Sequence, residues 1–237
     1  MSLTIITTFS EKNYDDYAKY FLSSAYAYLK NVNVRLYTDV PYENLPENFE
    51  NFILEDACPE LVQFKKRNSS KKIPSGKRGF IQDAVRFAHK SYAIIHASRT
   101  VNTKRLVWLD ADTEILKTLD HNYFKSHLPK GNFVAYLGRE KKYSETGYLQ
   151  FYLNKKSYKF FDKWQWYYDT DRIYNLPGQL DCHVFDACLN ELNFVGHNLS
   201  PNISKRHFDI TFKNYMCHYK GNDKENRNFY FKKAKLL

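Results

Sequence analysis

Long apolar runs are missing from this chain of 237 residues. No segment approaches the roughly 18 continuous apolar residues that indicate a membrane-spanning helix, so we expect no transmembrane segment. The first residues show neither the basic region nor the apolar core of a secretory signal peptide. Internal repeats, low-complexity tracts and linker-like stretches are also lacking. These features predict a single domain that spans residues 1–237.

Cysteine is scarce as well, with Cys58, Cys182, Cys188 and Cys217 but no C-x-x-C pair. So few cysteines, without the spacing of a small disulfide-rich domain, indicate reduced thiols. A zinc site that combines the last three with neighbouring histidines would match no usual ligand spacing. The cysteine content therefore predicts a cytoplasmic protein.

Positive charge is in excess, because 36 Lys and Arg against 26 Asp and Glu give a net charge of +10. A basic surface attracts nucleic acid, anionic lipid or small anionic substrates. No nucleic-acid recognition motif accompanies the charge, so we expect no nucleic-acid partner, although a basic nucleic-acid-binding module and peripheral contact with anionic surfaces stay open. The densest basic cluster, at residues 65–78, contains Asn, Ser, Pro and Gly and is predicted to be a solvated loop.

Apolar periodicity predicts an α/β fold whose first half is parallel and whose second half is mixed. A strand at residues 3–9, a helix at 15–30 and a strand at 33–38 form a β-α-β opening with a right-handed crossover. The clearest helix, 79–97, has a charged stripe of Asp83, Arg86 and Lys90 beside its apolar stripe. Further strands are predicted at residues 51–54, 106–109, 132–137, 148–154, 194–199 and 215–219, and further helices at 157–168 and 180–192.

The most informative stretch is an apolar strand that ends in two carboxylates. Residues 106–109 are all apolar, which is typical of a strand buried on both faces in a parallel sheet. Asp110 and Asp112 follow, and in an extended backbone their side chains would point to the same side. Ligands bind at the carboxyl ends of strands in open α/β sheets. Because carboxylates suit Mg²⁺ or Mn²⁺ that also contacts phosphate, the stretch predicts a metal site for a phosphorylated substrate.

Five short stretches, at residues 80–90, 108–113, 145–147, 180–182 and 218–224, occur in an informative order. Together they resemble nucleotide-sugar-dependent glycosyltransferases of the GT-A fold, most closely small bacterial and viral members and more distantly the glycogenin/galactosyltransferase-like group. The resemblance implies a single-domain α/β fold with a mixed central sheet and flanking helices. It also implies that a hexosyl or pentosyl group moves from a nucleoside diphosphate sugar, with a UDP-sugar as the expected donor, to a hydroxyl of a glycan or other acceptor.

The resemblance further implies a metal centre and a phosphate clamp. Asp110, Asp112 and His218 would hold Mn²⁺ or Mg²⁺, and imidazole is an acceptable ligand for Mn²⁺. Lys220 and Gly221, followed by Lys224, would bind the donor diphosphate. This is sensible chemistry, because glycine lets the backbone approach a phosphate and lysine offers a compact cation.

The same resemblance assigns the remaining roles. It implies a nucleotide-binding half at residues 1–112 and an acceptor-side half at 113–237. Asp181 and Glu145 would be the catalytic carboxylates, although Asp181 also stands where a helix N-cap is expected. The other implied contacts are to the donor from Thr7, Thr8, Phe9, Asp83, Arg86, Lys90 and Asp110, and to the acceptor or the sugar from Thr146 and Gly147.

A different enzyme class also fits the carboxylate motif. An apolar strand followed by Asp-x-Asp-x-Thr is the nucleophile motif of haloacid-dehalogenase-type phosphohydrolases, in which Asp110 would be the nucleophile. Such enzymes need a second acidic motif at a strand end. The available pair, Asp169 and Asp171, follows a predicted helix, and 109 residues precede the first motif. This phosphohydrolase stays as the alternative enzyme.

Overall fold

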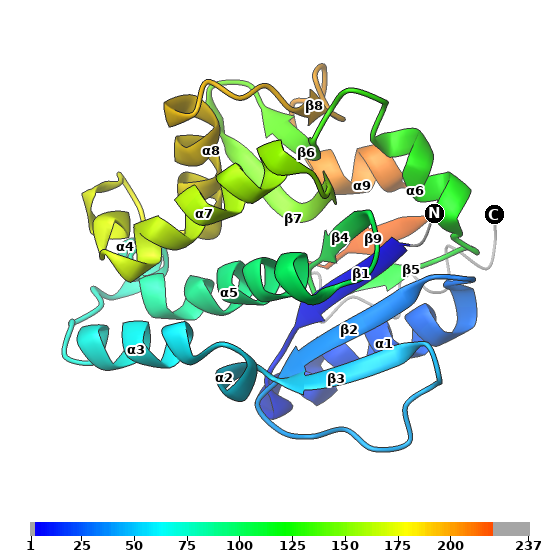
Figure 1. Cartoon of the computed structure of the whole chain (residues 1–237), viewed down its shortest axis with the longest axis horizontal. Helices are drawn as coiled ribbons and strands as arrows, with labels where there is room; N and C mark the ends of the chain where they lie inside the picture. The colour runs from blue at the N-terminus through cyan, green and yellow to red at the C-terminus, as the bar shows by residue number, and fades with distance from the viewer. Residues whose placement is uncertain (1–2, 220–237) are drawn as a thin grey trace.

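The computed structural model describes residues 3–219 and shows a seven-stranded mixed sheet with helices on both faces (Figure 1). The strand order is β3-β2-β1-β4-β7-β6-β8. The first four strands of this order are parallel, whereas β7 runs antiparallel to both β4 and β6. The predicted α/β architecture with a parallel first half and a mixed second half is therefore confirmed.

The described part of the chain contains the following elements. The strands are β1 Leu3–Thr8, β2 Asn33–Thr38, β3 Phe49–Ile53, β4 Arg105–Leu109, β5 Thr113–Ile115, β6 Val134–Arg139, β7 Lys142–Tyr152, β8 His197–Asn198 and β9 Met216–His218. The α-helices are α1 Lys19–Tyr28, α2 Leu54–Ala57, α3 Pro59–Asn68, α4 Gly76–Phe80, α5 Ala84–Thr100, α6 His121–His127, α7 Lys155–Asp169, α8 Asp181–Glu191 and α9 His207–Phe212. Shorter helical turns lie at Glu11–Asn13, Tyr14–Ala18 and Arg172–Asn175.

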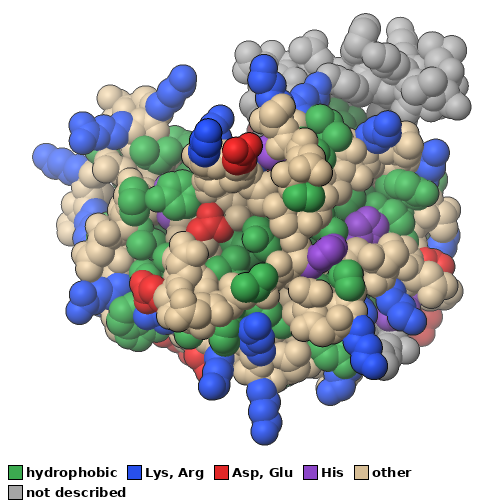
Figure 2. All heavy atoms as spheres, turned by 90° about the horizontal axis from the view of Figure 1, so that it is seen from above, with side chains coloured by type: hydrophobic (Ala, Val, Ile, Leu, Met, Phe, Trp, Pro, Cys, Tyr) green, Lys and Arg blue, Asp and Glu red, His purple; other side chains and the backbone are tan. Residues whose placement is uncertain are grey.

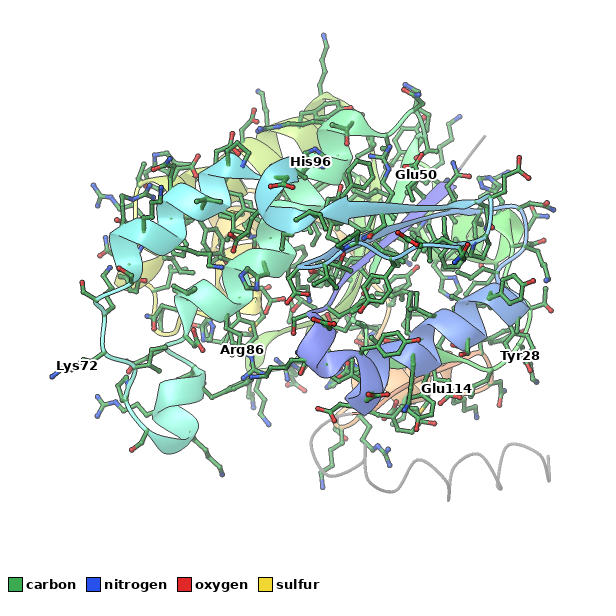
Figure 3. All side chains as sticks on the ribbon, turned by 90° about the horizontal axis from the view of Figure 1, so that it is seen from below. Tyr28, Glu50, Lys72, Arg86, His96 and Glu114 are labelled. Carbon is green, nitrogen blue, oxygen red and sulfur yellow. The ribbon has the colours of Figure 1, made fainter. Side chains whose placement is uncertain are left out.

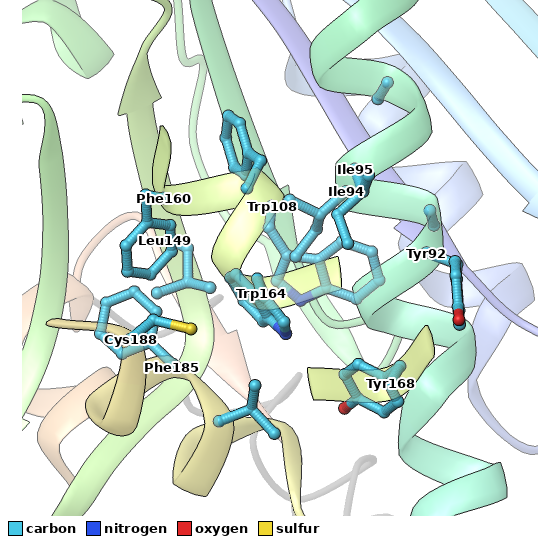
Figure 4. Packing of buried hydrophobic residues seen from close by; sticks show 14 of the residues in the cluster. Tyr92, Ile94, Ile95, Trp108, Leu149, Phe160, Trp164, Tyr168, Phe185 and Cys188 are labelled. Atoms are coloured by element: carbon cyan, nitrogen blue, oxygen red, sulfur yellow. The ribbon is translucent and has the colours of Figure 1, made fainter. Parts of the chain in front are cut away.

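Strand β4 lies at the centre of the sheet and is buried on both faces. Leu106 and Trp108 belong to one apolar cluster, with side chains from α3, α5, α7 and α8. Val107 and Leu109 belong to a second cluster, with side chains from α1, α6 and α9. Figure 4 shows Trp108 packed among aromatic side chains of the first cluster. The alternation explains why all four residues are apolar, as the sequence predicts for a doubly covered strand.

The predicted helix at 79–97 is wrong at its start, because two helices occupy this region. The short α4 ends at Phe80, and α5 begins only at Ala84. Asp83 separates them: its carboxylate accepts a 3.0 Å hydrogen bond from the backbone N–H of Arg86. A side chain that caps the first turn of a helix fixes where the helix begins. The apolar pattern alone did not distinguish this boundary from a continuous helix.

The prediction that residues 65–78 form a loop is also wrong in part. Lys65, Lys66 and Arg67 form the last turn of α3. Leu61 and Phe64 in the same helix are fully buried, so the apolar face is anchored while the lysines face outward. On the face shown in Figure 2, Lys and Arg side chains are more widespread than Asp and Glu. No helix among residues 3–219 combines the length and the apolar character that crossing a membrane requires.

Other predicted boundaries differ in smaller ways. The predicted strand at 194–199 is only two residues long, His197–Asn198, and β7 begins well before residue 148. The predicted helix at 15–30 becomes a π-helical turn followed by α1. Strand β5 and helices α2, α3, α6 and α9 were not predicted at all. Of these elements, β5 and α9 position the site described next.

Candidate metal centre

The carboxylates of Asp110 and Asp112, which follow β4, converge on one point, although the backbone turns there. The N–H of Thr113 donates to the carbonyl of Asp110 over 2.9 Å, so residues 110–113 form a turn and the backbone is not extended there. The carboxylates nevertheless meet at one imidazole. Asp112 Oδ1 lies 2.8 Å from Nε2 of His218, and Asp110 Oδ2 lies 3.5 Å from the same nitrogen.

His218 reaches this position through a second, two-stranded sheet. Strand β9 pairs antiparallel with β5, and His218 stands opposite Thr113 in the register. The backbone N–H of His218 donates to Asp209 in α9 over 3.1 Å, and the ring of Phe208 packs edge-on against the imidazole at 5.0 Å between centroids. Donor atoms of Asp110, Asp112 and His218 all lie within 4.8 Å of one another. Two carboxylate oxygens and one imidazole nitrogen at this spacing fit a divalent cation such as Mn²⁺.

Gly147 allows the imidazole to approach the carboxylates. A Cβ at this position would lie 2.7 Å from Cε1 and 2.8 Å from Nδ1 of His218, and 3.3 Å from Oδ2 of Asp110. Its backbone carbonyl also accepts a hydrogen bond from the N–H of Asp110. A side chain here would displace the imidazole, so the role of this glycine is close packing against the centre. The resemblance implied contact with the acceptor or the sugar instead, which stays a prediction.

A buried lysine holds the carboxylates from the other side. Lys90 Nζ lies 3.0 Å from Asp110 Oδ1 and 2.7 Å from Asp181 Oδ2, and it also donates to the carbonyl of Thr146. The indole Nε1–H of Trp108 donates to the same oxygen of Asp110 over 2.7 Å. Asp110 therefore presents its other oxygen, Oδ2, towards His218.

The contacts around Lys90 and Asp181 set the charge states of these two groups. Burial alone would lower the pKa of Lys90, but the fields of Asp110 and Asp181 outweigh it and raise this pKa above its usual 10.5. Burial would raise the pKa of Asp181, but Lys90 and the hydroxyl of Thr146, which donates over 2.6 Å, hold it below 3.8. Both groups are charged at neutral pH.

The imidazole of His218 responds to the same negative field. Burial would lower its pKa, but the hydrogen bond to Asp112 and the nearby Glu145 and Asp110 raise it from 6.5 to about 9. Glu145 Oε1 lies 3.5 Å from Nδ1 of the ring. A site that favours a proton on this imidazole is a site of strong negative potential, which a divalent cation would occupy in its place.

The predicted donor residues of β1 lie at the carboxyl end of that strand. Thr7 is fully buried, and the hydroxyl of Thr8 donates to the carbonyl of Tyr37 over 2.7 Å. Phe9 is also buried, and its ring meets Tyr42 edge-on at 5.5 Å between centroids. The described structure thus places these three beside strand β2 and supplies internal partners for Thr8 and Phe9.

Arg86 and a tyrosine that the sequence analysis missed lie near the metal centre. Burial, together with the field of Asp112, raises the pKa of Tyr17 to about 12, although the field of Arg86 acts to lower it. Arg86 is in the first turn of α5 (Figure 3). Tyr17 therefore lies near both the carboxylate cluster and Arg86. Nothing local in the sequence marked Tyr17, because it lies in a π-helical turn far from the Asp-x-Asp motif.

The structure gathers half of the predicted site residues in one place. Lys90, Asp110, Asp112, Asp181 and His218 form one cluster, with Glu145, Thr146 and Gly147 of β7 beside it. Asp83 instead caps α5, and Lys220, Gly221 and Lys224 lie outside the described residues. The sequence analysis missed Trp108, Phe208 and Asp209, which orient the ligands.

Comparison with known proteins identifies the fold. No protein-family model and no curated protein matches the sequence. Among solved structures, the chain is similar to mouse xyloside xylosyltransferase 1 in its apo form, with a TM-score of 0.54 and 11% identity over 84% of this chain and 86% of that one. It is also similar to apo WbbM, a bifunctional glycosyltransferase, with a TM-score of 0.54 and 12% identity over 93% of this chain but only 46% of that one. The chain therefore has a GT-A-type glycosyltransferase fold, as the resemblance implied.

Proposed function

We propose that this protein is a metal-dependent glycosyltransferase that uses a nucleoside diphosphate sugar, with UDP-sugar as the expected donor. The observation that carries the proposal is the meeting of Asp110, Asp112 and His218 within 4.8 Å at the end of β4. The fold shared with two glycosyltransferases supports it. A divalent cation held by these three residues, Mn²⁺ or Mg²⁺, would neutralise charge on the diphosphate leaving group.

The proposed reaction exchanges one bond to the anomeric carbon for another. The bond between this carbon and the diphosphate oxygen breaks, and its electron pair leaves with the nucleoside diphosphate. A bond to the acceptor hydroxyl oxygen forms, and the hydroxyl proton passes to a carboxylate or to the leaving group. Glu145 is the carboxylate that borders both the metal centre and the pocket described below. Asp181 is neutralised by Lys90 and therefore holds that lysine in place, a positioning role that we prefer to the catalytic one.

The remaining assignments are part of the same proposal. Arg86 and the β1 residues Thr7 to Phe9 would contact the nucleotide side, while Thr146 and Gly147 would border the sugar. Residues 1–112 would supply most of the nucleotide contacts and 113–237 the acceptor side. Lys220, Gly221 and Lys224 would bind the diphosphate.

The phosphohydrolase alternative finds less support in the contacts. Asp110 Oδ1 already accepts from Trp108 and pairs with Lys90. The second acidic motif is engaged elsewhere, since Asp169 accepts from Tyr92 over 2.6 Å and Asp171 accepts from Asn68 over 3.0 Å. Among residues 3–219, the acidic groups next to Asp110 are Asp112, which faces His218, and Asp181, which is paired with Lys90.

The proposal predicts that UDP binding requires Mn²⁺ and the carboxylate of Asp112. In calorimetric titrations the wild-type protein should bind UDP in the presence of Mn²⁺ and much more weakly in the presence of a chelator. Asp112→Asn should lose the Mn²⁺-dependent part, because one ligand and one negative charge are removed from the centre. Asp162→Asn, which changes an exposed carboxylate on α7, is the matched control and should bind as the wild type does. Unchanged Mn²⁺-dependent binding by Asp112→Asn would overturn the metal assignment.

A further inference from the structure

A pocket of about 310 Å³ opens beside the metal centre, on the side of Glu145 and His218. Its walls come from the β6–β7 hairpin, through Arg139 and Lys142, and from residues 204–209, the segment that leads into α9. Asp110 and Asp112 do not line it. A molecule in this pocket would therefore lie beside Glu145, which approaches Nδ1 of the imidazole, whereas Asp112 faces Nε2.

The pocket is rich in positive charge. Four cationic side chains line it, from Arg139, Lys142, Lys205 and Arg206, against the two carboxylates of Glu145 and Asp209. Neither Lys142 nor Lys205 forms an ion pair with any carboxylate in residues 3–219. Their charges are therefore available to a bound anion.

The two arginines are held in place by the protein. The guanidinium of Arg139 donates to the backbone carbonyls of Tyr143 and Ser144 in the hairpin, the latter over 3.1 Å. Arg206 pairs with Asp209 over 3.0 Å and adopts a left-handed backbone conformation with φ of 47°. A non-glycine residue pays a conformational cost there, which the surrounding structure must offset. Arginines fixed in this way lose little freedom when they bind a phosphate or a carboxylate.

The pocket lies apart from the residues that are proposed to contact the nucleotide. Tyr17 lies within the electrostatic reach of Asp110, Asp112 and Arg86, and none of these four residues lines the pocket. A donor whose nucleotide is held by Arg86 and the β1 residues, as proposed above, would place its nucleoside outside the pocket. The pocket beyond Glu145 is then the space into which the acceptor enters.

We propose that this pocket binds an anionic group, a phosphate or a carboxylate, carried by the acceptor. The inference rests on the proposed glycosyl transfer and narrows its acceptor to an acidic molecule. Phosphate and carboxylate share the geometry that an arginine fork and two lysines recognise. An anionic group held here would place a neighbouring hydroxyl beside Glu145, which lines both the pocket and the metal centre.

The test measures sugar binding to the full chain while UDP and Mn²⁺ are present at saturation. Glucose 6-phosphate, glucuronate and glucose are titrated separately and followed by ligand-observed NMR. At least one of the two anionic sugars should bind more tightly than glucose, by about tenfold or more, as expected for charge-assisted hydrogen bonds. The anion that binds more tightly identifies phosphate or carboxylate as the preferred group.

Variants then locate the binding. The double substitution Lys142→Gln with Lys205→Gln should remove most of the preference for the anionic sugar, whereas Lys159→Gln, an exposed lysine on α7, should preserve it. Thermal unfolding verifies that each variant is folded. Equal affinity for glucose and both anionic sugars would overturn the proposal, as would an unchanged preference in the double variant.

A competition experiment separates this inference from the proposed function. If UDP with Mn²⁺ displaces the anionic sugar, the pocket is the diphosphate site and the acceptor assignment is wrong, while glycosyl transfer stands. If the wild-type protein shows no Mn²⁺-dependent UDP binding at all, the proposed function fails, whatever the sugars do.

Discussion

Gly147 is the residue on which the approach of His218 to the carboxylates depends. In Gly147→Ala the new methyl group would lie 2.7 Å from Cε1 of His218, so the imidazole must move. We expect this variant to lose Mn²⁺-dependent UDP binding and about 1–3 kcal/mol of stability, as overpacking does in other buried sites. Calorimetry measures the first effect and thermal unfolding the second.

The matched control is a second glycine with an equally close neighbour. A Cβ at Gly138 in β6 would lie 2.5 Å from the side-chain nitrogen of Asn198, away from the metal centre. Gly138→Ala should also destabilise the fold but bind UDP and Mn²⁺ normally at temperatures where it is folded. Equal loss of binding in both variants would show that Gly147 acts through general stability alone.

The ion pair between Lys90 and Asp181 makes a second prediction at the scale of single residues. Both partners are buried, and removal of one partner from a buried pair costs about 3–5 kcal/mol. Asp181→Asn should therefore be destabilised by about 3 kcal/mol at neutral pH, because Asp110 still partners the lysine. Lys90→Met combined with Asp181→Leu should recover part of the loss, since the buried pair is removed whole and Asp110, which loses its lysine, is partly exposed and still accepts from Trp108.

The pH dependence of this loss has a definite sign. The pKa of Asp181 is held below 3.8 in the folded protein, so its contribution is present above pH 3.8 and is lost as the pH falls through the lower, folded value. The pKa of Lys90 is raised above 10.5, so its contribution is present below that pH and is lost only at more alkaline pH. Urea unfolding should show a wild-type advantage over Asp181→Asn that is constant from pH 5 to 9 and shrinks below pH 4. An advantage that grows in acid would contradict the depressed pKa.

At the scale of elements, the start of α5 decides how Asp83 is interpreted. Its carboxylate caps the helix by accepting from Arg86, and loss of such a cap costs about 1 kcal/mol. Asp83→Ala should therefore lower the free energy of unfolding by this amount, whereas Asp83→Ser, which keeps a capping oxygen, should be nearly as stable as the wild type.

Activity of the same variants tests the donor role that the resemblance implied. If Asp83 also binds the sugar, Asp83→Ser should retain stability and UDP affinity but lose transfer and sugar preference. Normal transfer by Asp83→Ser would confine Asp83 to the cap.

Helices and strands whose own residues show a clear apolar pattern were predicted well, and those without such a pattern were not. The apolar run at residues 106–109 is enough to predict β4, because each of its side chains packs against helices on one of the two faces of the sheet. Helix α9 is six residues long and is held in place by Phe208 and Phe212 packing under the sheet, so its own sequence carries little pattern. The boundary between α4 and α5 depends on a single cap, which apolar periodicity does not register.

At the scale of the whole molecule, the order of the motifs was enough to predict the architecture but not the shape of the site. Asp110 and Asp112 are separated by one residue in the chain, and their closeness was predictable. The contact of His218 with them depends on the β5–β9 pair and on the missing side chain at Gly147, neither of which a local pattern reveals. The basic pocket likewise joins a hairpin to residues 204–209, and only the folded chain brings these together.

The pairing of β5 with β9 also has a consequence for the time at which the cluster forms. His218 follows Asp112 by 106 residues, so a ribosome that adds about 5–20 residues per second delivers the histidine about 5–20 s after the carboxylates. During that interval the nascent chain has both aspartates and Lys90, but not the imidazole that completes the cluster. Under the proposed function, the complete cation site would therefore form only after all seven strands of the central sheet have been synthesised.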